Sequence, residues 1–174
     1  MATIKPTYTD ATAITATGLA SLGSTTADPP AGYELGDIDN TTNLFIDALL
    51  RGKIKTGTSP SASKQIIVCV YGVVKASGPT LYYPAGITGS AGARTLATAG
   101  AVGQLGVTPI AFIPTNNTSD QDYNFGPFSV KKALGMDDLP PYWGVFVYHN
   151  TGVAFNATGS NFTMHYQGIQ RTVA

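Results

Sequence analysis

The chain has 174 residues and a mass of 18.0 kDa, and its ten basic side chains balance its ten acidic ones. This length suits one domain that buries roughly 70% of its unfolded surface without a metal or a disulfide, and a disulfide within the chain is excluded by the single Cys69. Only 11% of the residues are charged, with no basic stripe and no apolar run of 18 residues. We therefore expect no nucleic-acid partner and no membrane span.

The first thirty residues form a zone of their own, rich in Thr, Ala and Ser and ending in Asp28-Pro29-Pro30. Weak alternation over Thr12–Thr17 leaves three alternatives open: an edge strand, an extended N-terminal arm that lies on a neighbouring subunit, or a loose terminus. We assign 1–30 to this arm or edge strand and 31–174 to a single domain. We expect deletion of 1–30 to leave that domain folded. No apolar run of signal length follows Met1, so we expect no leader peptide.

Two apolar segments carry the strongest structural signal. Leu44–Lys55 alternates as a long strand, with Leu44, Ile46, Ala48 and Leu50 on one face. A helix at 43–50 is the competing interpretation, but Gly52 and the alternation after it disfavour a helix. Gln65–Val74 is almost continuously apolar, which is typical of a central strand covered on both sides. We expect the two segments to pair as a long antiparallel hairpin.

The rest of the chain is dominated by short strands and turn residues. Residues 84–106 are rich in Gly, Ala and Thr, which predicts a long connection. Pro109 interrupts an apolar run and predicts an edge strand there. The other expected elements are strands near Thr95 and at 106–114, 123–130, 142–149, 153–157 and 162–169, and a helical turn at 131–135 that ends at Gly135. These strands predict an all-β, antiparallel, jelly-roll-like sandwich of about eight strands.

The residue types that perform chemistry are few and scattered. His149 lies in phase with Trp143 and other apolar positions of its strand, and His165 lies on a polar face, so we expect structural roles for both. Cys69 falls in the apolar run, which predicts an inert buried thiol. Asp120 and Asp122 resemble the start of a calcium loop, but Phe125 and Lys131 occupy its Gly and Glu positions. We therefore expect no enzymatic activity, no cofactor and no metal site.

Several motifs carry a family resemblance. They are Ile38–Leu49; Asn116-Asn117-Thr118 followed by Gly126–Val130; Leu139–Val147; Asn150–Ala154; and Tyr166-Gln167-Gly168. In this order they resemble small virion structural proteins of tailed bacteriophages, from about Ile38 to Gly168. The first thirty residues have no counterpart in the resemblance, and its motifs are structural rather than catalytic.

The resemblance implies a jelly-roll virion component of the capsid decoration or cement type. It implies two partners, the major capsid protein and further copies of the chain, with a homotrimer favoured. It also implies a place on the outer capsid surface after synthesis in the host cytoplasm. We expect Ile4, Pro6, Tyr8 and Ile14 of the arm to form the interface. The alternative is a tail, baseplate or fibre-attachment component that recognises the host through Tyr82-Tyr83 and Asn116–Tyr123.

Overall fold

The computed structural model describes residues 4–75, 79–97, 102 and 106–173. Its strands are β1 (Ile4–Ile14), β2 (Ala31–Asp39), β3 (Asp47–Lys55), β4 (Lys64–Lys75), β5 (Leu81–Tyr82), β6 (Gly92–Thr95), β7 (Val107–Thr115), β8 (Asp122–Ser129), β9 (Tyr142–His149) and β10 (Thr163–Val173). One short helix, α2 (Val130–Leu134), follows β8, and 3-10 turns lie at Thr17–Leu19 and Gly159–Asn161.

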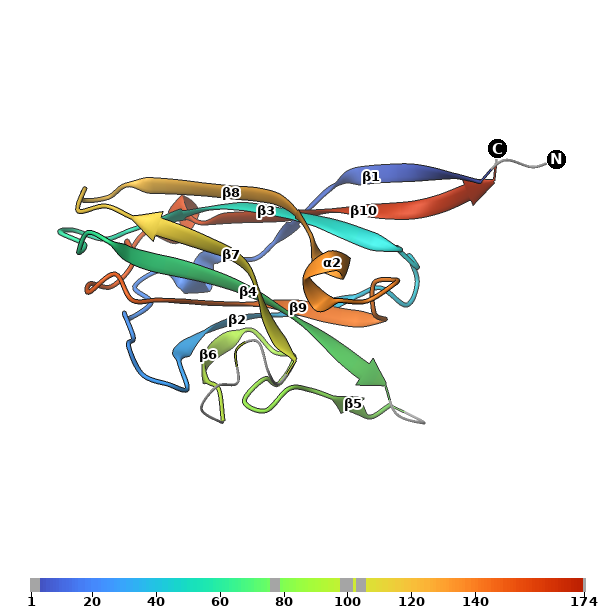
Figure 1. The fold of residues 1–174 in the computed structure, drawn as a ribbon, viewed down its shortest axis with the longest axis horizontal. Coiled ribbons are helices and arrows are strands. Elements are labelled where there is room, and N and C mark those ends of the chain that lie inside the picture. The colour runs from blue at the N-terminus through green and yellow to red at the C-terminus, as the bar shows by residue number, and fades with distance from the viewer. Residues whose placement is uncertain (1–3, 76–78, 98–101, 103–105, 174) are drawn as a thin grey trace.

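The strands form two antiparallel sheets that pack face to face (Figure 1). One sheet has the order β1-β10-β3-β8. In the other, β4 pairs with β9, β9 with β2 and β2 with β6, while β7 and β5 pair with β4. The eight longer strands therefore divide evenly between the sheets, with β1, β3, β8 and β10 in one and β2, β4, β7 and β9 in the other. The predicted jelly-roll sandwich is confirmed.

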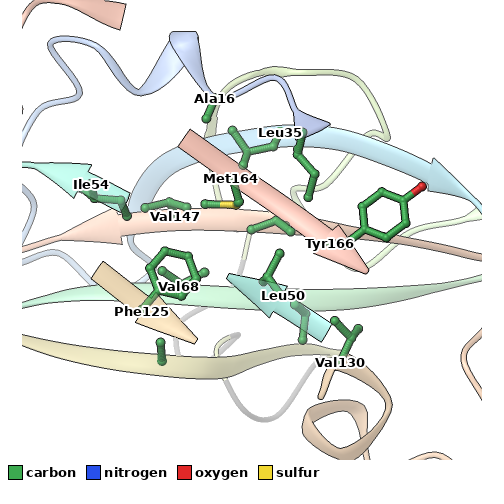
Figure 2. Close-up of a cluster of buried hydrophobic side chains, with 14 of the residues drawn as sticks. Ala16, Leu35, Leu50, Ile54, Val68, Phe125, Val130, Val147, Met164 and Tyr166 are labelled. Carbon is green, nitrogen blue, oxygen red and sulfur yellow. The ribbon is translucent and has the colours of Figure 1, made fainter. Parts of the chain in front are cut away.

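The predicted hairpin between the two apolar segments is wrong. β3 pairs with β10 and β8, whereas β4 pairs with β9 and β7 in the opposite sheet. The loop between them crosses from one sheet to the other, so the two strands face one another across the core. Figure 2 shows Leu50 and Ile54 from β3 and Val68 from β4 in the same cluster of buried side chains. The apolar faces of β3 and β4 complement each other because the two strands pack together across the core. No strand pairing joins them.

The core lies between the sheets and extends to the outer side of β4. Trp143 on β9 is fully buried and meets Tyr166 on β10 edge to face, with ring centroids 5.5 Å apart. On the other side of β4, Cys69 and Tyr71 pack against Ile87 and Leu96 from the chain between β5 and β7. The prediction of a central strand covered on both sides is confirmed.

Three other segments differ from what the sequence predicts. The strand expected at 44–55 starts only at Asp47, because Leu44 adopts φ 50° and the side-chain amide of Asn40 bonds both the N–H and the carbonyl of Phe45. The strand expected at 153–157 is reduced to a single bridge between Phe155 and Thr56. β2 was not predicted, because its sequence AGYELGDID mixes glycine and carboxylates with few apolar residues.

The predictions for the helical turn and for β9 are confirmed. Ser129 caps α2 by accepting a hydrogen bond from the Lys132 N–H, and Gly135 ends it in the left-handed region at φ 66°. β9 spans Tyr142–His149 as expected. The expected edge strand containing Pro109 is β7.

The N-terminal zone has two parts in the structure. Residues 4–14 form β1, the edge strand of its sheet, which pairs with β10. Residues 15–30 cross the end of the sandwich toward β2 and place Ala16 and Leu19 in the core, Leu19 fully buried. Deletion of 1–30 would remove a strand and this core side chain. The expectation that the truncated domain stays folded is therefore withdrawn.

Candidate interaction surface

The two histidines are separated, and His149 has its partners inside the protein. His149 is fully buried, stacked on Phe155 at 3.7 Å between ring centroids, and its two ring nitrogens lie 2.9 Å from Thr151 Oγ1 and from the Leu22 carbonyl oxygen. Burial lowers its pKa to about 4, so the ring is neutral near pH 7. His165 lies on the outer face of its sheet, opposite Arg51. The position of His149 agrees with the predicted structural role, and the role of His165 stays a prediction.

Cys69 is fully buried, and burial raises the pKa of its thiol, which leaves it unreactive. The aspartates of the calcium-like loop have other partners. Asp122 lies 3.6 Å from the Lys53 ammonium and 3.9 Å from that of Lys55, and Asp120 accepts a hydrogen bond from Asn156. Among the described residues, no three His, Cys, Asp or Glu side chains gather where they could hold a metal ion.

A buried polar network connects β2 to the chain between β5 and β7. Glu34 is fully buried, and its carboxylate accepts hydrogen bonds from the Gly89 N–H at 2.6 Å, the Tyr71 hydroxyl at 2.9 Å and Arg94 Nε at 3.1 Å. Burial raises the pKa of the neighbouring Asp37, while hydrogen bonds from the Tyr83 and Tyr71 hydroxyls act in the opposite direction. Every oxygen is used inside the protein, so the network fastens the covering loop and leaves no carboxylate free for a substrate.

The most distinctive surface is a two-stranded ribbon formed by β1 and β10. β10 pairs with β3 only from Thr163 to Ile169, whereas it pairs with β1 as far as Val173. Figure 1 shows β1 and β10 continuing side by side past the end of β3. The residues beyond β3 have no third strand beside them, and an isolated two-stranded ribbon is only marginally stable in water.

The register of the ribbon sorts its side chains into two faces. Three pairs lie directly opposite each other on the outer face: Ile4 with Val173, Pro6 with Arg171, and Tyr8 with Ile169. The other face carries Lys5 with Thr172 and Thr7 with Gln170. The outer face is therefore mostly apolar, and the other face is polar. Ile4, Tyr8 and Val173 are 65%, 56% and 73% exposed.

A β-bulge at Thr9 and Asp10 separates this outer face from the core. Between the Tyr8–Ile169 pair and the Ala11–Gln167 pair, β1 has one residue more than β10. The Thr9 hydroxyl accepts a hydrogen bond from the Gly168 N–H at 3.1 Å, which satisfies the ladder there. The extra residue reverses the alternation, so Ile14 lies opposite Met164 and points into the core.

The four predicted interface residues are thus divided. Ile4, Pro6 and Tyr8 share the outer face of the ribbon, as an interface would require. Ile14 is only 8% exposed and belongs to the core, so its inclusion in the interface is corrected. Ile169, Arg171 and Val173 complete the same face from the C-terminal strand. Sequence reasoning missed them because nothing local shows that the two ends of the chain pair.

The outer strands are protected against edge-to-edge pairing. Each long edge strand contains proline: Pro6 in β1, Pro109 and Pro114 in β7, and Pro127 in β8. Proline lacks an N–H, so Pro6 can pair opposite Arg171 only with its nitrogen turned to the open side, where it blocks strand addition. Association is therefore expected through faces and loops rather than through strand edges.

The exposed apolar side chains gather at one end of the sandwich. Among the described residues, the large exposed ones are Ile4, Tyr8, Leu44, Val74, Tyr82, Phe112, Phe128, Met136 and Val173. Strand pairing places Ile4, Tyr8, Val74, Tyr82 and Val173 at the end that carries the ribbon. Leu44 lies there too, three residues before the β3 residue that pairs with Ile169, and Met136 lines one pocket with Val74. The loops at the opposite end, 56–63, 116–121 and 150–161, expose mainly Ser, Thr, Asn and Gly. We call the ribbon end the apolar end, although it also carries exposed charged side chains such as Asp138 and Arg171, and the opposite end the polar end.

Comparisons with known proteins found no matching family model, no matching curated protein and no matching solved structure. Within the described part of the chain, no helix combines the length and the hydropathy needed to cross a bilayer.

Proposed function

We propose that this protein is a structural component of a tailed-bacteriophage virion, a capsid decoration or cement protein on the outer shell. Its proposed partners are the major capsid protein and further copies of the chain, in a homo-oligomer with a trimer favoured. The sequence motifs supply the resemblance to virion proteins. The jelly-roll fold is compatible with this role but serves many others, so it is not the argument.

The observation that carries the proposal is the division of the molecule into an apolar and a polar end. Clustered exposed apolar side chains mark interaction sites on folded proteins. A protein that binds an assembled shell has one face toward the shell and one toward solvent, which matches this division. Binding only to the assembled shell would stabilise it by mass action. The absence of a free, gathered set of titratable side chains in the described residues fits a structural role better than a catalytic one.

The copy number of the protein in purified particles tests this proposal. Quantitative mass spectrometry would compare it with the major capsid protein. A ratio near one, or hundreds of copies for each particle, supports a place on the shell. A few to a few tens of copies would favour the tail or baseplate alternative. Absence from the particle would contradict the virion assignment altogether.

A further inference from the structure

We propose that the outer face of the β1–β10 ribbon is the anchor by which the protein binds the shell. Its partner there is a protein surface with an apolar strip bordered by carboxylates. The ribbon face is defined as the three register pairs Ile4–Val173, Pro6–Arg171 and Tyr8–Ile169. This inference rests on the proposed function and specifies the surface and the chemistry of the partner.

The apolar character of the face has no explanation within the monomer. Ile4, Tyr8 and Val173 are all more than half exposed, although they occupy alternate positions that would face a core in a covered sheet. Burying such a side chain against a partner removes apolar surface from water and stabilises the complex. A few central aromatic and aliphatic residues with an arginine are the usual energetic centre of an interface.

The charge of the ribbon identifies the partner further. Among the six residues of the ribbon face, Arg171 is the one charged side chain, and Lys5 lies on the opposite face. Arg171 lies 3.9 Å from Asp138, and both side chains are about 60% exposed, so this ion pair is weak and can be exchanged for a partner's carboxylate. Arg171 is the middle residue of the β10 side of the face, where a bidentate contact with a carboxylate would be sheltered by apolar neighbours.

The same arginine disfavours two-fold pairing of this face with the ribbon face of a second copy of the chain. If two ribbon faces packed about a two-fold axis, the middle pair, Pro6–Arg171, would lie near its own symmetry mate. The two guanidinium groups would then repel one another. Six side chains are also far fewer than the roughly 20–30 residues a side of a stable interface. The ribbon is therefore an anchor within a larger contact that includes other residues of the apolar end.

Cosedimentation with purified shells that lack this protein tests the inference. The first variant combines Ile4→Ser and Tyr8→Ser, and the second is Arg171→Glu. We expect each to weaken shell binding by about tenfold or more. The matched control for the charge change is Lys5→Glu, which alters a cation on the opposite face of the same ribbon. The control for the loss of apolar side chains is Phe112→Ser, because Phe112 lies on β7 and its side chain is 62% exposed. Both controls should bind within about twofold of the natural protein.

Each outcome is decisive. The fluorescence of the single Trp143 reports unfolding, and unchanged unfolding of the variants shows that a loss of binding is not a loss of fold. If the natural protein binds shells and both ribbon variants bind equally well, the ribbon inference is overturned while the virion assignment stands. If Lys5→Glu and Arg171→Glu weaken shell binding equally, the assignment of binding to one face of the ribbon is overturned. If a ribbon variant instead dissociates an oligomer of the free protein, the occupant is a second copy. If the natural protein neither binds shells nor occurs in particles, both proposals fail.

Discussion

His149 on β9 holds its ring Nε2 2.9 Å from the carbonyl oxygen of Leu22, which lies 127 residues earlier in the chain. A carbonyl oxygen only accepts, so the neutral ring carries its proton on Nε2, and Nδ1 shares the single proton of the Thr151 hydroxyl with the Val153 carbonyl oxygen. A backbone hydrogen bond also joins the segment after β1 to β9, because the Thr25 N–H donates to the His149 carbonyl at 2.8 Å. One neutral histidine therefore ties the segment that follows β1 to the second sheet.

We predict that stability falls on acidification because of His149. Burial lowers its pKa in the folded protein to about 4, from 6.5 for the ordinary side chain. Between these two values the unfolded chain binds more protons than the folded one, so the free energy of unfolding decreases as pH falls. The full loss is about 3 kcal/mol. Urea unfolding followed by Trp143 fluorescence, from pH 7.5 to 4.5, measures it.

The control is a pair of matched variants. His149→Gln should remove most of this pH dependence, whereas His165→Gln, on the outer face of its sheet, should retain it. Asp37 acts in the opposite direction, because its raised pKa favours the folded state in acid, but all three proteins share that contribution. An unchanged slope in His149→Gln would contradict the assignment to this residue.

Leu19 should behave as a core residue although it lies outside the strands. It is fully buried in the 3-10 turn between β1 and β2. We predict that Leu19→Ala lowers the free energy of unfolding by about 2–5 kcal/mol, since it leaves a cavity between the sheets. Leu44→Ala, at a 70% exposed position, should change it by less than about 0.5 kcal/mol. Equal effects in denaturant unfolding would show that residues 15–30 are not part of the domain.

Glu34 and Arg94 should differ in their effect on the loop that covers β4. We predict that Glu34→Ala destabilises the protein by about 1–3 kcal/mol, because it leaves the Gly89 N–H without its acceptor, while Arg94 keeps Thr88 and the Tyr71 hydroxyl keeps Asp37. Arg94→Ala should cost more, about 3–5 kcal/mol, since it leaves the fully buried Glu34 carboxylate without its cation. Limited proteolysis should cut Arg94→Ala first within 83–94. If the protease cuts at another site earlier than it cuts within 83–94, the role of the Glu34 network in holding this loop is contradicted.

Pro6 should protect the open edge of β1 from strand addition. We predict that Pro6→Thr, which restores an N–H donor on that side, makes the protein associate as its concentration rises. Sedimentation velocity over a range of concentrations measures this. Pro6→Asp is the matched control, because it restores the same donor but adds a charge that opposes edge pairing. Association of both variants to the same extent would show that the N–H alone is responsible, and association of neither would contradict the protective role.

Local sequence signals predicted those elements whose structure depends on neighbours in the chain. The apolar run around Cys69 indicated a strand covered on both sides, and Gly135 indicated the end of a helical turn. Alternation in β10 placed Met164 and Tyr166 on one face, and Pro109 indicated an edge strand. In each case the signal is a property of a few consecutive residues, such as side-chain alternation or a restricted backbone angle.

By itself, then, the sequence determined the fold class, the low charge and the lack of an obvious catalytic set. It could not determine which strands pair, because β3 and β4 are neighbours in sequence yet belong to opposite sheets. Only the tertiary structure joined Tyr8 to Ile169, and only the bulge at Thr9 and Asp10 sent Ile14 to the core. Pairing between the two ends of a chain depends on long-range contacts that leave no local pattern, and one inserted residue reverses every side chain beyond it.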